Sequence, residues 1–135
     1  MITPDEQFYR EYILDHYRNP RNFGRLDLAD ISHEEENPLC GDVVAMDFKL
    51  NDGRIEDVRF HGRGCAISQA SASLLTERIK GMSLEDAKRV SKEDVLAELG
   101  IEISPARLKC ALLSLKVLKA GAYGVAGWPG EEEST

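Results

Sequence analysis

The stretch VVAMDFKLNDGRIEDVRF, residues 43–60, decides the fold. Its first part carries four apolar side chains at every second position, Val44, Met46, Phe48 and Leu50. Asp47 and Lys49 fall on the opposite face, which gives the period-two pattern of a half-buried strand. The turn-forming sequence Asn-Asp-Gly at residues 51–53 then reverses the chain, and residues 54–60 continue the apolar face. These features predict an antiparallel hairpin.

Segments on both sides of this hairpin predict a small sheet packed by helices. A third, weakly patterned strand is expected at about residues 29–35. After the hairpin, a glycine-rich turn at residues 62–64 leads into a helix that begins near Ala66 or Ile67. Because helices follow a small antiparallel sheet, we place the chain in the α+β class.

The first helix is expected to open at residues 3–6 and to end by Asn19, before Pro20. Its apolar stripe suits a docking face better than a cofactor site and comprises Phe8, Tyr9, Tyr12, Ile13 and Tyr17. His16 lies near the end of this helix, where a surface histidine interacts favourably with the helix dipole. We therefore expect His16 at the surface.

Capping signals predict the later helices. Capping-box patterns begin at Ser83 and Ser91 and predict two short helices, the second closed by Gly100. The Ser-Pro pair at residues 104–105 opens one last helix, which is expected to continue to residue 121. Residues 1–122 should form the folded domain. The glycines, proline and terminal acid run of residues 123–135 predict a flexible C-terminal tail.

Length and composition restrict the classes of function. A chain of 135 residues has the size of one domain with one core. No stretch approaches the roughly 20 continuous apolar residues of a membrane helix, and the polar N-terminus lacks the pattern of a secretory signal. We therefore expect a cytoplasmic protein that does not act at a membrane. The net charge of -7 disfavours nucleic acid as a partner, because phosphate binding needs clustered Lys and Arg.

The three cysteines are the candidate reactive residues. Their odd number and unpaired spacing argue against a disulfide framework, which leaves metal binding, redox chemistry or plain burial. Cys65 lies at a predicted helix N-terminus, where the dipole and unpaired N–H groups stabilise a thiolate. Cys110 lies among leucines, where a buried thiol without a function is an equally good interpretation.

Cys40 and Asp42 precede the first strand of the hairpin and are two residues apart. In an extended segment their side chains point to one side and can reach one ion, although for an isolated C-x-D pattern the favoured interpretation is that Asp42 caps a turn after Gly41. Three thiolates and one carboxylate would complete a tetrahedral zinc site, or the ligation of a small iron–sulfur cluster. A carboxylate in place of a fourth thiolate would hold such a cluster less durably. This property suits a site that assembles a cluster and then releases it.

Two cations and two histidines are weaker candidates for a role in the metal or cluster site. Lys109 could offer a charged donor to bound sulfur, and Arg107 adds a second cation, but both also suit a solvated first turn of the last helix. His33 and His61 lack the spacing that ligands would require, so we expect them to be surface or strand residues.

Four motifs in this order resemble the IscU/SufU proteins of iron–sulfur cluster assembly, the NifU N-terminal type: DHYRNPRNFG, NPLCGD, GRGCAISQASAS and PARLKCALLSLKVL. The similarity extends from about Phe8 to Lys119. It implies a SufE/NifU-like α+β fold, with a small three-stranded antiparallel sheet packed by helices. It also implies one set of metal or cluster ligands at an exposed end of the fold: Cys40, Asp42, Cys65 and Cys110.

The chain combines features of two branches of this family. Lys109 stands where IscU scaffolds carry a histidine before the last cysteine, as in the SufU branch. Residues 103–107 read Ile-Ser-Pro-Ala-Arg where the scaffold branch has a Leu-Pro-Pro-Val-Lys chaperone-recognition segment, so a chaperone of that type is not expected. The segment from Ser83 to Pro105 lacks the insertion typical of SufU. The sequence therefore does not assign the chain to the IscU or the SufU branch.

The resemblance implies two alternative functions. A non-enzymatic scaffold would accept sulfur from a cysteine desulfurase and iron from an iron donor, hold a transient [2Fe-2S] cluster, and pass it to apo iron–sulfur proteins or carrier proteins. A sulfurtransferase would instead use Zn2+ at the same residues and accept persulfide sulfur from the desulfurase. The chain length favours the scaffold, whereas Lys109 and Arg107 favour the sulfurtransferase, so whether the chain is an enzyme stays open.

Cys40 is the expected persulfide acceptor in either scheme, and Cys110 is the alternative. The working form could be a monomer or a homodimer. A purely structural zinc domain is a third class, but the carboxylate ligand counts against it, because structural zinc sites are normally closed sets of cysteine and histidine.

Overall fold

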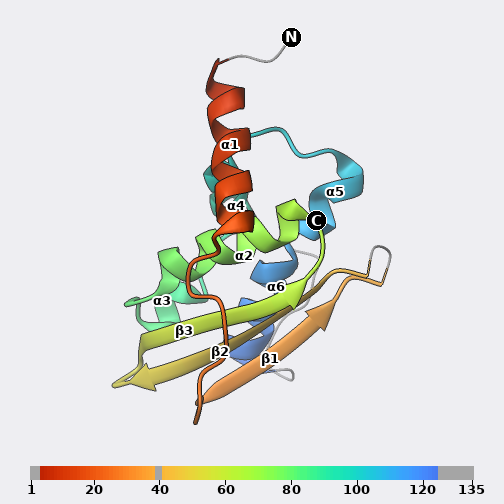
Figure 1. The fold of residues 1–135 in the computed structure, drawn as a ribbon. Helices are drawn as coiled ribbons and strands as arrows, with labels where there is room; N and C mark the ends of the chain where they lie inside the picture. The colour runs from red at the N-terminus through yellow and green to blue at the C-terminus, as the bar shows by residue number, and fades with distance from the viewer. Residues whose placement is uncertain (1–3, 39–40, 125–135) are drawn as a thin grey trace.

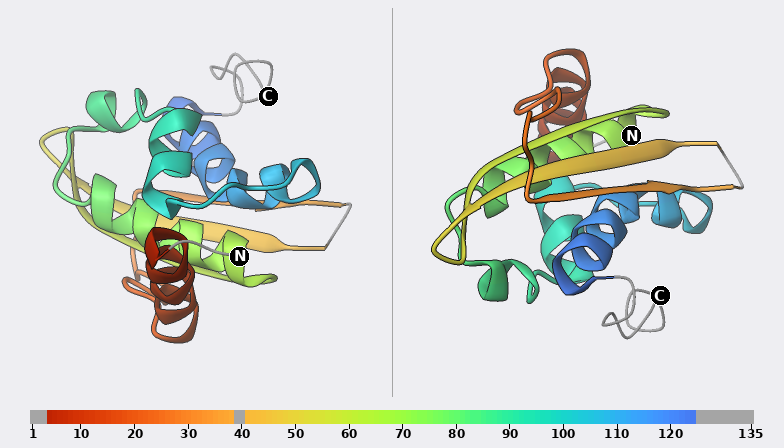
Figure 2. Two further views of the ribbon diagram at one scale, coloured as in Figure 1. Left: turned by 90° about the horizontal axis from the view of Figure 1, so that it is seen from above. Right: turned by 90° about the horizontal axis from the view of Figure 1, so that it is seen from below.

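The computed structural model describes residues 4–38 and 41–124, and these form a three-stranded antiparallel sheet with helices on one face (Figures 1 and 2). The strand order is β1-β2-β3. Helices α2 (Ala66–Ile79) and α6 (Leu113–Tyr123) pack against the sheet and enclose the main hydrophobic core with it. The predicted α+β fold is confirmed. Among the described residues, none of the helices has the length and hydrophobicity that crossing a bilayer requires.

The predicted hairpin is formed by β2 (Val43–Asn51) and β3 (Arg54–Arg63), which pair in antiparallel register. Asp52 and Gly53 make the turn, both with positive φ (51° and 77°), as a tight two-residue hairpin loop requires. Large side chains from both strands are fully buried against the helices, including Met46, Phe48, Val58 and Phe60. The period-two pattern therefore identified the core face correctly.

Strand β1 (Ile31–Glu36) pairs antiparallel with β2 and is the predicted third strand. Its residues alternate between half-buried and exposed, and its sequence, ISHEEE, offers few apolar side chains to mark it. It lies at the edge of the sheet, where acidic side chains discourage pairing with another chain. This position explains its weak sequence pattern.

The segment that joins α1 (Pro4–Arg18) to β1 pairs with β3 at Phe60 and then crosses the sheet to Asp47, on the face away from α2 and α6 (Figure 1). The Gly24 N–H donates to the carbonyl of Phe60 at 2.7 Å. The Leu26 N–H and the Ser32 hydroxyl donate to the carboxylate of Asp47 at 3.0 and 2.8 Å. Asp47, expected on the polar face, does lie there, but it is only 3% exposed because this segment covers it.

The two short helices begin at the predicted caps. Ser83 accepts from the Asp86 N–H before α3 (Leu84–Ala87), and a complete capping box at Ser91 opens α4 (Lys92–Leu99). Gly100 closes α4 in the left-handed conformation, with φ of 70°. A Cβ there would also lie 2.2 Å from the ring of Tyr9, so a larger side chain would displace this ring.

The last predicted helix is two helices, α5 (Pro105–Ala111) and α6, which are separated at Leu112. Leu112 leaves the helical conformation, with φ of -100° and ψ of 2°. At this break the carbonyl of Ala111 accepts a hydrogen bond from the Ser71 hydroxyl of α2, at 2.7 Å. The prediction of one continuous helix was wrong, because a tertiary contact supports the break and no local sequence signal marks it.

Helix α1 uses only part of its apolar stripe for packing. Ile13 is 3% exposed and joins a small second core with α2, α4 and α5, whereas Phe8 is 61% exposed. The exposed side chains of the stripe leave the docking-face interpretation as a prediction. The flexible tail at residues 123–135 also stays a prediction, since the described residues end at 124 and Tyr123 belongs to α6.

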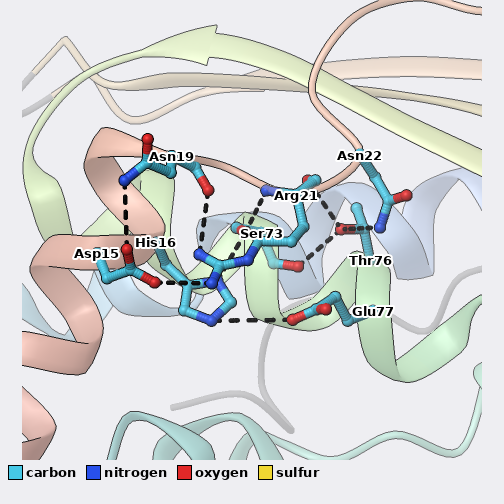
Figure 3. Close-up of polar contacts among 8 residues, drawn as sticks. All are labelled: Asp15, His16, Asn19, Arg21, Asn22, Ser73, Thr76 and Glu77. Atoms are coloured by element: carbon cyan, nitrogen blue, oxygen red, sulfur yellow. Dashed lines mark hydrogen bonds and ion pairs between the residues drawn. The ribbon is translucent and has the colours of Figure 1, made fainter.

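His16 was expected at the surface, and the structure contradicts this: it is 1% exposed and faces α2 (Figure 3). Its Nδ1 lies 2.8 Å from the hydroxyl of Ser73, and its Nε2 lies 3.8 Å from the carboxylate of Glu77. Burial lowers the pKa of His16, the Arg21 cation lowers it further, and Glu77 partly opposes them. His16 therefore joins α1 to α2, and its lowered pKa favours the neutral imidazole.

Candidate metal and cluster site

Asp42 lies in a short loop between β1 and β2, and backbone hydrogen bonds close this loop. The Asn37 N–H donates to the carbonyl of Asp42 at 2.8 Å, and the Gly41 N–H donates to the carbonyl of Asn37 at 2.7 Å. Gly41 adopts φ of 76°, which glycine tolerates without a steric penalty. Asp42 is only 4% exposed, whereas an aspartate that simply caps a surface turn would be solvated.

Cys65 lies at the N-cap of α2, at the strand-to-helix junction that the glycine-rich turn predicted. Its N–H donates to the Asp42 carboxylate at 3.3 Å, so the start of α2 and the Asp42 loop meet. Gly64 makes this approach sterically feasible, because a Cβ there would lie 2.5 Å from the carboxyl carbon of Asp42. Cys65 itself is partly exposed.

Cys110 is contributed by the last turn of α5 and is only 3% exposed. The side-chain amide of Asn37 donates to its sulfur at 3.8 Å. Sequence reasoning did not single out Asn37, although it is the first residue of the NPLCGD motif. The Ser71 contact at the adjacent helix break fixes the backbone directly after Cys110.

Three of the four predicted ligands converge, from a loop, a helix N-terminus and a helix C-terminus. One carboxylate oxygen of Asp42 and the sulfurs of Cys65 and Cys110 all lie within 4.8 Å of one another. Ligands of one tetrahedral zinc ion are separated by about 3.3–3.8 Å, so small side-chain rotations would bring these atoms onto one ion. The donor types and their spacing fit zinc or a small cluster. Cys40 lies outside the described residues.

The remaining predicted site residues lie outside this ligand group. Arg107 and Lys109 are exposed on α5, and Lys109 directly precedes Cys110. His33 in β1 forms a hydrogen bond with Glu35, and His61 lies in β3, so both are strand residues, as expected. Within residues 4–38 and 41–124, the potential metal ligands that cluster are Asp42, Cys65 and Cys110.

Comparisons with known proteins agree over most of the chain. Residues 8–130 match the model of the NifU-like N terminal domain. The chain is 41% identical to the zinc-dependent sulfurtransferase SufU of Bacillus subtilis, over 86% of this chain and 90% of that protein. It is 40% identical to the iron-sulfur cluster assembly scaffold protein IscU of Escherichia coli, over 83% and 89% respectively. A crystal structure of a scaffold protein for the SUF system from Fervidobacterium islandicum aligns with a TM-score of 0.76 at 28% identity, covering 87% of this chain and 98% of that one.

Proposed function

The chain belongs to the family of NifU-like N-terminal domains, and from this membership we propose that it is a scaffold for iron–sulfur cluster assembly. It accepts sulfur from a cysteine desulfurase and iron from a donor. It holds a transient [2Fe-2S] cluster as cargo and passes the cluster to apoproteins or carrier proteins. The cytoplasmic location and a homodimeric form stay predictions.

The observation that carries this proposal is the convergence of Asp42, Cys65 and Cys110 within 4.8 Å. Cysteine sulfurs are the usual protein ligands of iron–sulfur clusters. A carboxylate oxygen is a harder ligand and binds the iron of a sulfide cluster less durably, which suits temporary storage. Cys40, two residues before Asp42, is the proposed fourth ligand and the first candidate to receive persulfide sulfur, with Cys110 as the alternative.

Replacing Asp42 by cysteine tests this assignment. Asp42→Cys puts a thiolate in place of the hard ligand, so a cluster assembled anaerobically with desulfurase, cysteine and iron should persist longer than in the wild type. Asp27→Cys is the matched control, because Asp27 is an exposed residue outside the ligand group. Absence of any cluster on the wild-type chain would overturn the scaffold proposal. Equal cluster lifetimes in Asp42→Cys and wild type would overturn the role of Asp42 in release.

A zinc-dependent sulfurtransferase is the second candidate, supported by the 41% identity to SufU and by the exposed cations Arg107 and Lys109. Cys40, Asp42, Cys65 and Cys110 would hold the zinc ion, and the zinc ion would keep the cysteine sulfurs as thiolates. Exposed cations next to such a site would favour attack of the Cys40 thiolate on the outer sulfur of the desulfurase persulfide. The old S–S bond breaks as the new one forms, so Cys40 becomes the persulfide and the desulfurase cysteine leaves as a thiolate.

Alanine production by the desulfurase separates the two candidates. Under the scaffold proposal, zinc-loaded protein changes desulfurase turnover little. A large stimulation that disappears in Cys40→Ser would favour the sulfurtransferase and make zinc the working metal.

A further inference from the structure

Asn37 connects two parts of the candidate site that are far apart in the sequence. It directly follows β1 and is 7% exposed. Its Nδ2 donates to the sulfur of Cys110, 73 residues later, at 3.8 Å. A distance of this length is within the range of hydrogen bonds to sulfur, which is a large and weak acceptor. The amide therefore contacts a predicted ligand from inside the protein.

The backbone of Asn37 is fixed by the same loop that carries Asp42. Its N–H donates to the Asp42 carbonyl and its carbonyl accepts from Gly41, at 2.8 and 2.7 Å. These two bonds do not involve the side chain, so a side-chain substitution leaves the loop closure available. Asn37 thus joins the Asp42 loop to helix α5 through one side-chain amide.

We infer that Asn37 is a positioning residue, which fixes the Cys110 sulfur relative to Asp42 and adjusts how strongly that sulfur donates to a bound metal. The inference rests on the proposed function, since it requires that Cys110 is a ligand. Partners that hydrogen-bond to metal ligands orient them and tune the metal, and their loss typically lowers metal affinity by about 10- to 100-fold. Hydrogen bonds to cysteine sulfur also shift the reduction potentials of iron–sulfur clusters.

Cobalt(II) titration of the metal-free chain tests this inference, because cobalt bound by cysteine gives sulfur-to-metal charge-transfer absorption. Asn37→Leu keeps the branched shape and the number of side-chain heavy atoms, is bulkier, and removes the donor. Asn37→Ser removes the amide without overpacking the site. Asn51→Leu, at the exposed end of β2, is the matched control. Both Asn37 variants should bind cobalt about 10- to 100-fold more weakly than the wild type, and the charge-transfer band should move to longer wavelength.

Each outcome of the titration has a distinct meaning. Wild-type affinity and an unchanged band in both Asn37 variants would overturn the positioning role and leave the proposed function intact. Weaker binding with an unmoved band would overturn the direct effect on the sulfur, because a loosened loop alone would explain it. Absence of a sulfur-to-cobalt band in the wild type would overturn both this inference and the proposed ligand set.

Discussion

Gly64→Ala should disrupt the candidate site more than it disrupts the fold. Gly64 has φ of 148°, and a Cβ there would lie 2.5 Å from the carboxyl carbon of Asp42 and 2.6 Å from one of its oxygens. Carbon atoms in contact are normally about 3.5–4.0 Å apart, so the carboxylate or the turn must move by about 1 Å or more. The Cys65 N–H already donates to this carboxylate at 3.3 Å, and such a displacement would break the bond.

The destabilisation caused by the clash with Asp42 can be separated from the backbone strain of an alanine at positive φ. An alanine at this φ costs about 1–3 kcal/mol of strain. Loss of the hydrogen bond to a charged acceptor adds about 1.5–3 kcal/mol. Gly24→Ala is the matched control, because Gly24 has φ of 135° and nothing within 4 Å of the added Cβ. The excess destabilisation of Gly64→Ala over Gly24→Ala should therefore be about 1.5–3 kcal/mol.

Urea unfolding of the metal-free variants measures their free energies of unfolding, and cobalt titration measures the metal affinity of the site. Metal–ligand distances tolerate only about 0.2 Å, so a displaced Asp42 should weaken cobalt binding at least about 10-fold in Gly64→Ala and leave it unchanged in Gly24→Ala. Equal unfolding free energies for the two variants, together with wild-type cobalt affinity in Gly64→Ala, would refute the packing of Gly64 against Asp42.

Three further changes test the fold. Phe60→Ala empties a fully buried position and should lower the unfolding free energy by about 3–5 kcal/mol in urea; a loss below 1 kcal/mol would contradict its place in the core. Ser71→Ala leaves the buried Ala111 carbonyl without its hydroxyl donor and should cost about 1–3 kcal/mol by the same assay, whereas no loss would show that the helix break does not need this bond. Burial lowers the pKa of His16 below 6.5, so the unfolded chain binds a proton more readily and stability should fall as the pH drops from 6.5 through the lowered folded-state pKa. His16→Gln should remove a slope of up to about 1.4 kcal/mol per pH unit in that window, and an unchanged slope would mean that His16 does not titrate on unfolding.

Local patterns predicted the elements that local forces determine. The hairpin follows from alternation over residues 43–60 and a turn that suits positive φ, and the caps at Ser83 and Ser91 act within one helical turn. Features fixed by distant contacts were missed. At the α5–α6 break the Ala111 carbonyl accepts from Ser71, 40 residues away, and His16 is buried against α2, where its partner Ser73 lies 57 residues later.

The candidate site shows the same division. Three cysteines and one aspartate in recognisable motifs were sufficient to predict a shared site, and the structure brings Asp42, Cys65 and Cys110 together. Asn37 was not predicted, because asparagine before a proline reads as a loop signal and its contact with Cys110 spans 73 residues. The position of Cys40 stays a prediction.

Cluster transfer is the measurement that tests the scaffold function most directly. The wild-type chain would be loaded anaerobically by a cysteine desulfurase with cysteine and iron, separated from the desulfurase, and mixed with an apo [2Fe-2S] protein. We expect iron and acid-labile sulfide to be bound in equal amounts on the chain and then to move together to the acceptor. A chain that retains zinc, binds no labile sulfide and delivers no cluster would contradict the scaffold function.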